Sequence, residues 1–303
     1  MLGRIHSLFS DRRLVHYLPY TILKKFLMAR RIKKSVPKEL MIALTFDVEH
    51  DPISESHEMI SDFLSRIEKV AEENSTFFVQ GNLINELANH LKELQKKNEI
   101  GLHGFAHELW GDEKWWIDKK TLNLKEKTRL LSLALSYLKK NGLKRSVSFR
   151  APYALINTEV LNLLKKFDFI IDSSATSYLG VPPLPNNLNG LISIPVTANP
   201  VPKISVRKMI PYCYYEIFTA ETVLSFNRKE LLDFITTITS FQKTHNCKPH
   251  LVFIAHPWEF VMFGGDRSYS SPKNYKLLKK IFSTLEKNCK VEYVTMKQLS
   301  KKL

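Results

Sequence analysis

The stretch MIALTFDVEHD (residues 41–51) joins an apolar run to three closely spaced carboxylates. Residues 41–47 predict a buried β-strand, because short apolar runs that end in polar residues are typical of strands in α/β proteins. If the strand continues, its alternation places Asp47, Glu49 and Asp51 on one face. Three carboxylates on one face repel one another and favour a bound cation. The alternative is a strand that runs into a solvated acidic turn.

Further short apolar runs follow this strand, and amphipathic segments separate them. Strands are expected at 41–47, 75–79, 99–103, 146–150, 168–172, 191–196, 250–256 and 291–294. Helices are expected at 55–73, 82–97, 122–141, 156–167, 228–245 and 273–288. This alternation is typical of βα units around a mostly parallel sheet, and the number of strands suggests a barrel.

One region interrupts the alternation. Residues 178–216 contain seven of the fourteen prolines, and proline both fixes φ and removes a backbone donor. We therefore expect a long ordered loop with at most one strand, which covers one end of the barrel.

Five polar residues that are far apart in the sequence end five of the expected strands: Asp47, His103, Arg150, Asp172 and His256. In parallel α/β barrels the active site is built at the carboxyl ends of the strands. Core packing does not explain this placement, so these ends are candidate site positions.

The motif GLHGFAH contains His103 and His107 at a spacing that can bring two imidazoles onto one metal ion. Alone, the pair is equally consistent with two surface histidines. Together with the carboxylates described above, it has the composition of a catalytic divalent site with an open position for water.

The polar residues at three other strand ends can each be interpreted either as site residues or as ordinary structural residues. Arg150, in FRAPY, can orient a carboxylate by bidentate hydrogen bonds or form an ordinary surface salt bridge. Asp172, in IIDSS, is a candidate site residue or the cap of a turn. His256, in IAHPWEF, is a candidate general acid or a core histidine with satisfied hydrogen bonds.

In their order along the chain, the motifs TFDVEHD, STFFVQG, EIGLHGFAH, FRAPY, IIDSS and IAHPWEF resemble those of the polysaccharide deacetylase family, also called the NodB homology domain or carbohydrate esterase family 4. The likeness spans about residues 40–303. We therefore expect a catalytic domain at 40–303 after a basic, amphipathic segment at 1–39. The resemblance implies an α/β fold, a distorted (β/α) barrel of seven or eight strands.

The resemblance also implies a divalent metal cofactor, with zinc expected first and cobalt or a similar ion as the alternative. His103 and His107 match the metal-binding histidines of the family. The usual motif has two adjacent aspartates, the second of which is a ligand, whereas here Val48 intervenes and the next carboxylate is Glu49. Glu49 is therefore assigned to the metal, with Asp51 as the fallback.

The remaining motif residues match the acid–base groups of the family. Asp47 matches the catalytic base, and Arg150 matches the arginine that orients it. His256 matches the catalytic acid, and Asp172 matches the aspartate that tunes this acid. The interval from Asp172 to His256 is longer than usual for the family.

The implied activity is hydrolysis of an N-acyl group, in the first place N-acetyl, on an amino sugar of a glycan or lipid-linked glycan precursor. One alternative is hydrolysis of another non-peptide C–N bond, in a formamido sugar or a cyclic amide. The other is a catalytically inactive glycan-binding barrel, although such a protein would need neither a base at Asp47 nor an acid at His256.

The charge of the chain is unevenly distributed. The net charge is +15, and residues 1–38 account for +9 of it, with ten Lys and Arg residues against Asp11. Within 14–34, aromatic and aliphatic residues alternate with the basic ones. This pattern predicts peripheral contact with an anionic membrane, and a helix docked on the barrel is the competing interpretation. Nucleic acid is an unlikely partner, because no recognised binding motif accompanies the charge.

The sequence also bears on location. No apolar run reaches the roughly 18 residues that a spanning helix needs. The first residues lack the pattern of a secretory signal. The three cysteines are widely spaced, without a CxxC pair, which favours a reducing compartment. We therefore expect a cytoplasmic protein, peripheral to the inner face of the membrane.

Overall fold

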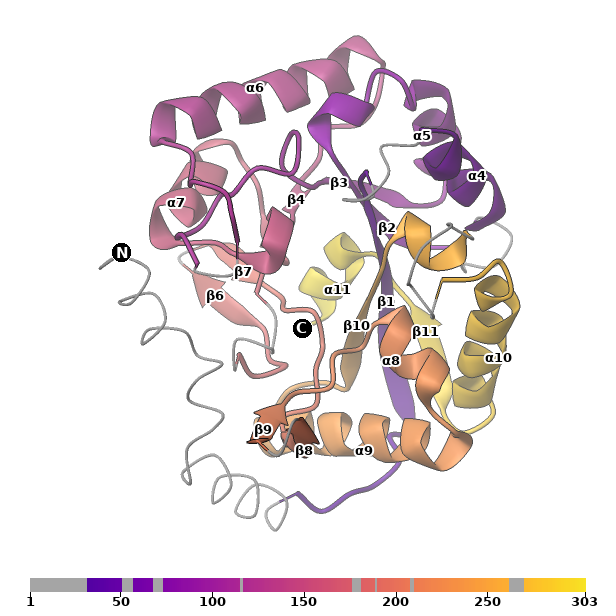
Figure 1. The fold of residues 1–303 in the computed structure, drawn as a ribbon. Helices are drawn as coiled ribbons and strands as arrows, with labels where there is room; N and C mark the ends of the chain where they lie inside the picture. The colour runs from indigo at the N-terminus through magenta and orange to yellow at the C-terminus, as the bar shows by residue number, and fades with distance from the viewer. Residues whose placement is uncertain are drawn as a thin grey trace.

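The protein is represented by a computed structural model, which describes residues 32–50, 57–67, 73–114, 117–175, 181–188, 190–207, 210–261 and 270–303. A curled, mostly parallel sheet lies at its centre and helices surround it (Figure 1). The strands of the main sheet are β1 (Glu39–Val48), β2 (Thr76–Val79), β3 (Glu99–Leu102), β4 (Ser148–Phe149), β5 (Ile171–Asp172), β6 (Asn186–Leu188), β7 (Leu191–Ser193), β10 (His250–Ala255) and β11 (Lys290–Tyr293). The α-helices are α4 (His57–Ile67), α5 (Ala88–Leu94), α6 (Leu124–Lys140), α7 (Thr158–Lys166), α8 (Ala220–Ser225), α9 (Arg228–Thr244), α10 (Asn274–Glu286) and α11 (Met296–Lys302).

Each strand expected from the sequence has a counterpart in the main sheet, and β6 is an addition to them. The order of strands is β10-β1-β2-β3-β4-β5-β7-β6, and β11 pairs with β1 off this path. All pairings in this sheet are parallel except that of β6 with β7. β10 occupies one edge of β1, while β11 and β2 follow one another along the other edge. The length of β1 thus lets three strands assemble on it.

The alternation of side chains along β1 separates two apolar clusters. The outer cluster lies between the sheet and the surrounding helices and includes Ile42, Leu44 and Phe46. The inner cluster is smaller and includes Met41 and Ala43, together with residues of α11. α11 therefore fills the inside of the curl below the carboxyl ends of the strands (Figure 1).

The curl is completed by irregular contacts instead of a regular ladder. Beyond β7, the backbone N–H of Thr197 donates to the carbonyl of Val252 in β10 at 3.1 Å. In return, the N–H of Val252 donates to Oγ1 of Thr197 at 2.8 Å. This arrangement is a distorted (β/α) barrel, which confirms the predicted fold class.

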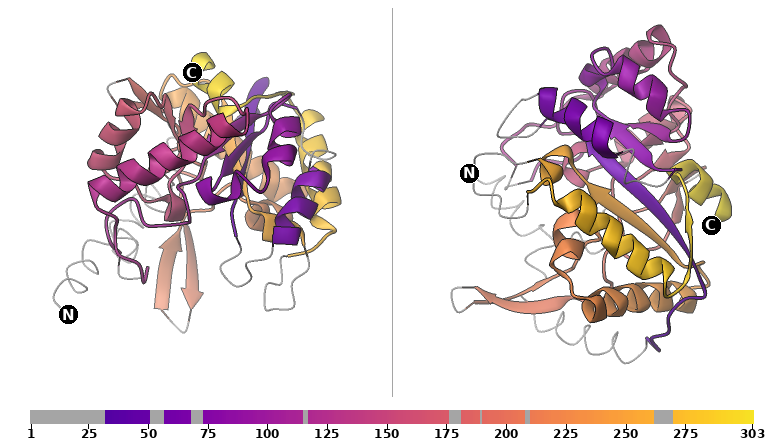
Figure 2. Two further views of the ribbon diagram at one scale, coloured as in Figure 1. Left: turned by 90° about the horizontal axis from the view of Figure 1, so that it is seen from above. Right: turned by 90° about the vertical axis from the view of Figure 1, so that its right-hand side faces the viewer.

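The expectation of at most one strand within 178–216 is wrong. Besides β6 and β7, this region contains β8 (Lys203–Arg207) and β9 (Ile210–Tyr214), which pair as an antiparallel hairpin. Figure 2 shows this hairpin projecting from the body of the molecule in both views. Pro211 lies within β9, opposite Val206. A two-stranded ribbon has free edges, so a proline there does not have to interrupt the ladder.

The expected helices are present, with two differences. The segment expected at 82–97 is divided into a 3-10 turn at Gly81–Leu83 and the helix α5. The short helices α8 and α11 were not predicted, because six or seven residues are too few for a clear helical period. Of the helix expected at 55–73, residues 55–56 and 68–72 lie outside the described residues.

The chain before β1 lies against α9. Nζ of Lys34 is 2.6 Å from Oδ1 of Asp233, and the N–H of Ser35 donates to Oγ of Ser240 at 3.1 Å. Residues 1–31 lie outside the described part, so the boundary at residue 39 stays a prediction. Within the described residues, no helix is long and apolar enough to cross a membrane.

Candidate active site

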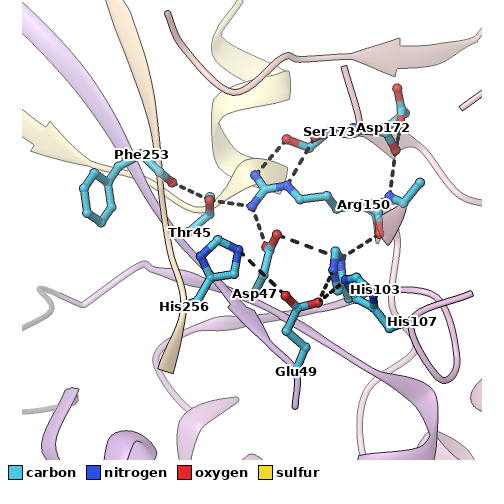
Figure 3. A network of polar contacts seen from close by, with 12 residues as sticks. Thr45, Asp47, Glu49, His103, His107, Arg150, Asp172, Ser173, Phe253 and His256 are labelled. Carbon is cyan, nitrogen blue, oxygen red and sulfur yellow. Dashed lines mark hydrogen bonds and ion pairs between the residues drawn. The ribbon is translucent and has the colours of Figure 1, made fainter. Parts of the chain in front are cut away.

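The end of β1 presents two carboxylates to the inside of the curl. Leu44, Phe46 and Val48 of β1 belong to the outer cluster. Since side chains alternate along a strand, Thr45, Asp47 and Glu49 face inward. Asp47 and Glu49 are each only 3% exposed. Figure 3 shows these two side chains meeting residues that follow β3, β4 and β10. The predicted shared face is therefore present for these two carboxylates, and Asp51 lies outside the described residues.

A buried arginine holds Asp47. Nη1 of Arg150, which follows β4, donates to Oδ1 of Asp47 at 2.6 Å and to Oγ1 of Thr45 at 2.9 Å. Its Nε and Nη2 donate to the carbonyl and the hydroxyl of Ser173 at 3.2 and 3.0 Å. The guanidinium also lies 4.2 Å from the ring centroid of Phe78. Each nitrogen of the guanidinium thus donates at least one hydrogen bond, which fixes the orientation of the carboxylate.

Burial lowers the pKa of Arg150, and Asp47 opposes this effect. The pKa of an arginine starts so high that the guanidinium remains charged. Asp47 therefore lies beside a permanent cation.

Glu49, His103 and His107 form a compact group of ligand-type side chains. Oε2 of Glu49 is 2.8 Å from Nε2 of His103 and 2.9 Å from Nε2 of His107. One ligand atom from each residue lies within 4.8 Å of the others. Oε2 is buried, yet it has no hydrogen bond of normal geometry within the described part of the chain. A buried carboxylate oxygen that meets two imidazole nitrogens in this way fits a divalent cation, and the three residues are the expected ligand set.

The tautomer of His103 supports this assignment. Its Nδ1 lies 2.9 Å from the carbonyl of Arg150, so Nδ1–H is the donor and Nε2, the atom beside Glu49, is the nitrogen that would bind a metal ion. Burial opposes a charged imidazole, but Asp47 and Glu49 outweigh it and raise the pKa of His103. Burial also tends to raise the pKa of Glu49, whereas the two histidines hold that pKa below its usual range. The pocket thus favours a cation beside Glu49 and Asp47.

His256 lies on the opposite side of Glu49. Its Nε2 is 3.8 Å from Oε1 of Glu49, and its Nδ1 donates to Oε1 of Glu259 at 2.8 Å. The ring stacks on Trp258 with centroids 4.4 Å apart and an interplanar angle of 12°. Burial opposes the charged ring, but Glu259 above all, with Glu49 and Asp47, raises the pKa of His256 to about 9. This imidazole is therefore protonated near neutral pH and able to act as an acid.

Glu259 is a site residue that the sequence analysis missed. It is only 4% exposed and lies in the 3-10 turn Pro257–Phe260 that follows β10. The available signal was a carboxylate three residues after a candidate histidine, between Trp258 and Phe260. In a helical turn, residues at this spacing lie on the same side.

Asp172 does not contact His256 in the described structure. Its Oδ1 accepts the N–H of Ser174 at 3.0 Å and Oδ2 accepts the hydroxyl of Ser193 at 2.9 Å. Burial raises its pKa, and Ser174, Ser193 and Arg150 oppose this. The carboxylate that contacts the candidate acid is that of Glu259, so the tuning role expected for Asp172 stays a prediction without a supporting contact.

The structure thus brings six of the seven predicted site residues into one polar network at the carboxyl ends of the strands: Asp47, Glu49, His103, His107, Arg150 and His256. Asp172 lies next to this network on the Arg150 side, since Ser173 bonds Arg150. The chemical roles of all seven remain predictions.

The fold and this network define a class of protein: distorted (β/α) barrels with a carboxylate–imidazole site at the carboxyl ends of the strands. Within that class, the model of the family described as polysaccharide deacetylase matches residues 34–170. This match confirms the relationship to the polysaccharide deacetylase family that the motifs indicate. The matched region contains the candidate ligands and Arg150, whereas His256 lies beyond it.

The chain is similar to several solved structures, of which the first named supports the fold. A candidate polysaccharide deacetylase from Mycobacterium smegmatis is 18% identical with a TM-score of 0.55, over 89% of this chain and 94% of the other. The peptidoglycan deacetylase PdaC from Bacillus subtilis is 17% identical with a TM-score of 0.44, over 86% and 90%. A carbohydrate esterase family 4 pseudoenzyme from Bacillus anthracis is 14% identical with a TM-score of 0.48, over 87% and 66%. No curated protein sequence shows a significant match to the chain.

Proposed function

We propose that the chain is a metal-dependent hydrolase that removes an N-acyl group, in the first place N-acetyl, from an amino sugar of a glycan or lipid-linked glycan precursor. The observation that carries this proposal is the combination of Glu49, His103 and His107 with a held carboxylate, Asp47, and a cationic imidazole, His256. Hydrolysis of an amide needs an activated water, a proton acceptor and a proton donor. The network contains a candidate for each.

Glu49, His103 and His107 are the residues that would hold the divalent ion. One carboxylate and two imidazoles form the ligand set of many catalytic zinc sites, so zinc is proposed first, with cobalt or a similar ion as the alternative. When bound, such an ion polarises a carbonyl and makes a water molecule more acidic.

Asp47 and His256 would move the protons. Arg150 occupies Oδ1 of Asp47, which leaves Oδ2 to accept a proton from the attacking water. His256 would donate its Nε2 proton to the departing sugar amine, because its Nδ1 is engaged by Glu259. Water adds across the C–N bond, so the products are a carboxylic acid and a free amine.

Two other functions remain as alternatives. Hydrolysis of another non-peptide C–N bond, in a formamido sugar or a cyclic amide, would use the same groups. A catalytically inactive glycan-binding barrel would not require the pairing of Arg150 with Asp47, or of Glu259 with His256. These two pairings favour a hydrolase.

The test is mass spectrometry of N-acetylated amino sugars, N-formylated amino sugars and lipid-linked sugars incubated with the zinc-loaded protein. We expect loss of an acetyl group from at least one substrate, and none with the His103→Ala, His107→Ala double variant. Loss of formyl alone would favour the first alternative. Sugar binding without loss of any acyl group, in protein that holds zinc, would overturn the proposal and favour a glycan-binding barrel.

We also propose peripheral contact with anionic membranes through residues 1–38, which would bring a cytoplasmic barrel to a lipid-linked substrate at the inner face. The support is the net charge of +9 in this segment together with its interspersed apolar residues. Nucleic acid is not part of the proposal.

A further inference from the structure

His107 has an unfavourable backbone conformation. Its φ is +58°, in the left-handed region that residues other than glycine rarely adopt. Tyr153 and Ala154, after β4, also have positive φ values of 60° and 55°. The rings of His107 and Tyr153 meet edge to face, with centroids 4.4 Å apart. Conformations of this kind cost free energy and persist only where surrounding contacts hold them.

One side of the loop that carries His107 is held by Glu108. Its carboxylate accepts the backbone N–H groups of Phe105 and Ala106 at 2.7 and 2.6 Å. It also accepts the indole N–H of Trp110, which is buried, at 2.7 Å. These bonds fix the turn before His107, but they do not restrain the carbonyl of His107 itself.

The other side is held by a second segment of chain. Leu109 and Thr121 form an isolated parallel bridge, and the N–H of Leu122 donates to the carbonyl of Leu109 at 3.2 Å. Because Leu109 and Thr121 pair in parallel, the residues two positions before each of them also lie side by side. These residues are His107 and Lys119. Nζ of Lys119 donates to the carbonyl of His107 at 2.9 Å and lies 5.7 Å from the ring centroid of Tyr153.

We propose that Lys119 is a positioning residue for the metal site, which holds the strained His107 so that its Nε2 stays directed at Glu49. The ammonium contacts both groups that define the orientation of this imidazole, its carbonyl and the tyrosine ring packed against it. The inference rests on the proposed function, because it assumes that His107 is a ligand. It assigns a role to a lysine twelve positions away in the sequence, outside all the motifs.

Two physical effects of Lys119 have opposite signs, and this makes the proposal testable. An ammonium close to a bound cation repels it, so electrostatics alone predicts tighter metal binding when the charge is removed. Lys119 is exposed, however, and its charge is screened by solvent. Residues that orient a ligand typically contribute 10–100-fold to metal affinity. Positioning should therefore outweigh repulsion.

The experiment measures the dissociation constant for zinc by competition with a chromophoric chelator, in the full-length chain. Lys119→Met keeps the aliphatic stem and removes the ammonium, and we expect about 10-fold weaker binding. Lys119→Arg keeps a cationic donor and should restore most of the affinity. The matched control Lys120→Met, at the exposed neighbouring position, should bind as the unaltered protein does.

A second comparison separates positioning from a general effect on folding. In the His107→Ala background, Lys119→Met should cause no further loss of zinc affinity, because the ligand that it positions is absent. Unchanged or tighter binding by Lys119→Met would overturn the proposal, as would an equal loss in both backgrounds. If the unaltered protein bound no zinc at all, the proposed function would fail first, and the two failures are thereby distinguishable.

Discussion

At the scale of single residues, we expect the pair of Glu259 and His256 to set the proton-donating capacity of the site. In the proposed reaction His256 must be protonated to donate, so activity should be lost as the pH rises through the pKa of this residue. Glu259 raises that pKa by its charge and by the hydrogen bond to Nδ1. Glu259→Gln keeps an acceptor for Nδ1 but removes the charge, so the pKa should fall.

We therefore expect Glu259→Gln to move the alkaline limb of the kcat/KM profile to lower pH. The same shift should appear when the His256 ring is titrated by NMR in the metal-free protein, where the unaltered residue should titrate near 9. A similar substitution at the exposed Glu286 serves as a control. An alkaline limb that stays in place would show that Glu259 does not tune this group.

At the scale of elements, α6 begins directly after the segment that carries Lys119. Asn123 caps this helix: its side chain accepts the N–H of Glu126 at 2.9 Å, and the carboxylate of Glu126 accepts the N–H of Asn123 at 3.2 Å. We expect Asn123→Ala to reduce the free energy of unfolding by about 1 kcal/mol. Asn123→Ser should retain most of it, since serine is also a good cap. Urea denaturation measures both variants, and equal stabilities for alanine and serine would contradict the role of the cap.

At the scale of the whole molecule, the charge is concentrated before the barrel. We expect the full chain to sediment with anionic vesicles at low salt, to bind neutral vesicles much less, and to lose the interaction as salt is raised. Replacing Lys24, Lys25, Arg30 and Arg31 by Glu should abolish this binding. Replacing four exposed lysines of the barrel, Lys96, Lys139, Lys166 and Lys276, by Glu should reduce it only slightly. Equal losses from the two sets would indicate a general effect of net charge.

The sequence by itself determined most of the strands and helices of the barrel and most of the residues that the candidate site brings together. Strand and helix periods are local properties, so short apolar runs and amphipathic segments could be recognised without knowledge of their partners. The rule that sites form at the carboxyl ends of parallel strands then brought Asp47, His103, Arg150 and His256 together. The inward alternation of β1 added Glu49 to the same face.

Only the tertiary structure decided the features that depend on distant pairing. The β8–β9 hairpin was not predicted because Pro211 lies within it, and a ribbon with free edges tolerates a proline where a central strand does not. Glu259 became the partner of His256, in place of Asp172, because the turn after β10 directs it back to the ring. Lys119 contacts His107 because the irregular segment that contains Lys119 pairs with the irregular segment that contains His107. Contacts of this kind arise from packing between segments, and no local period in the sequence encodes them.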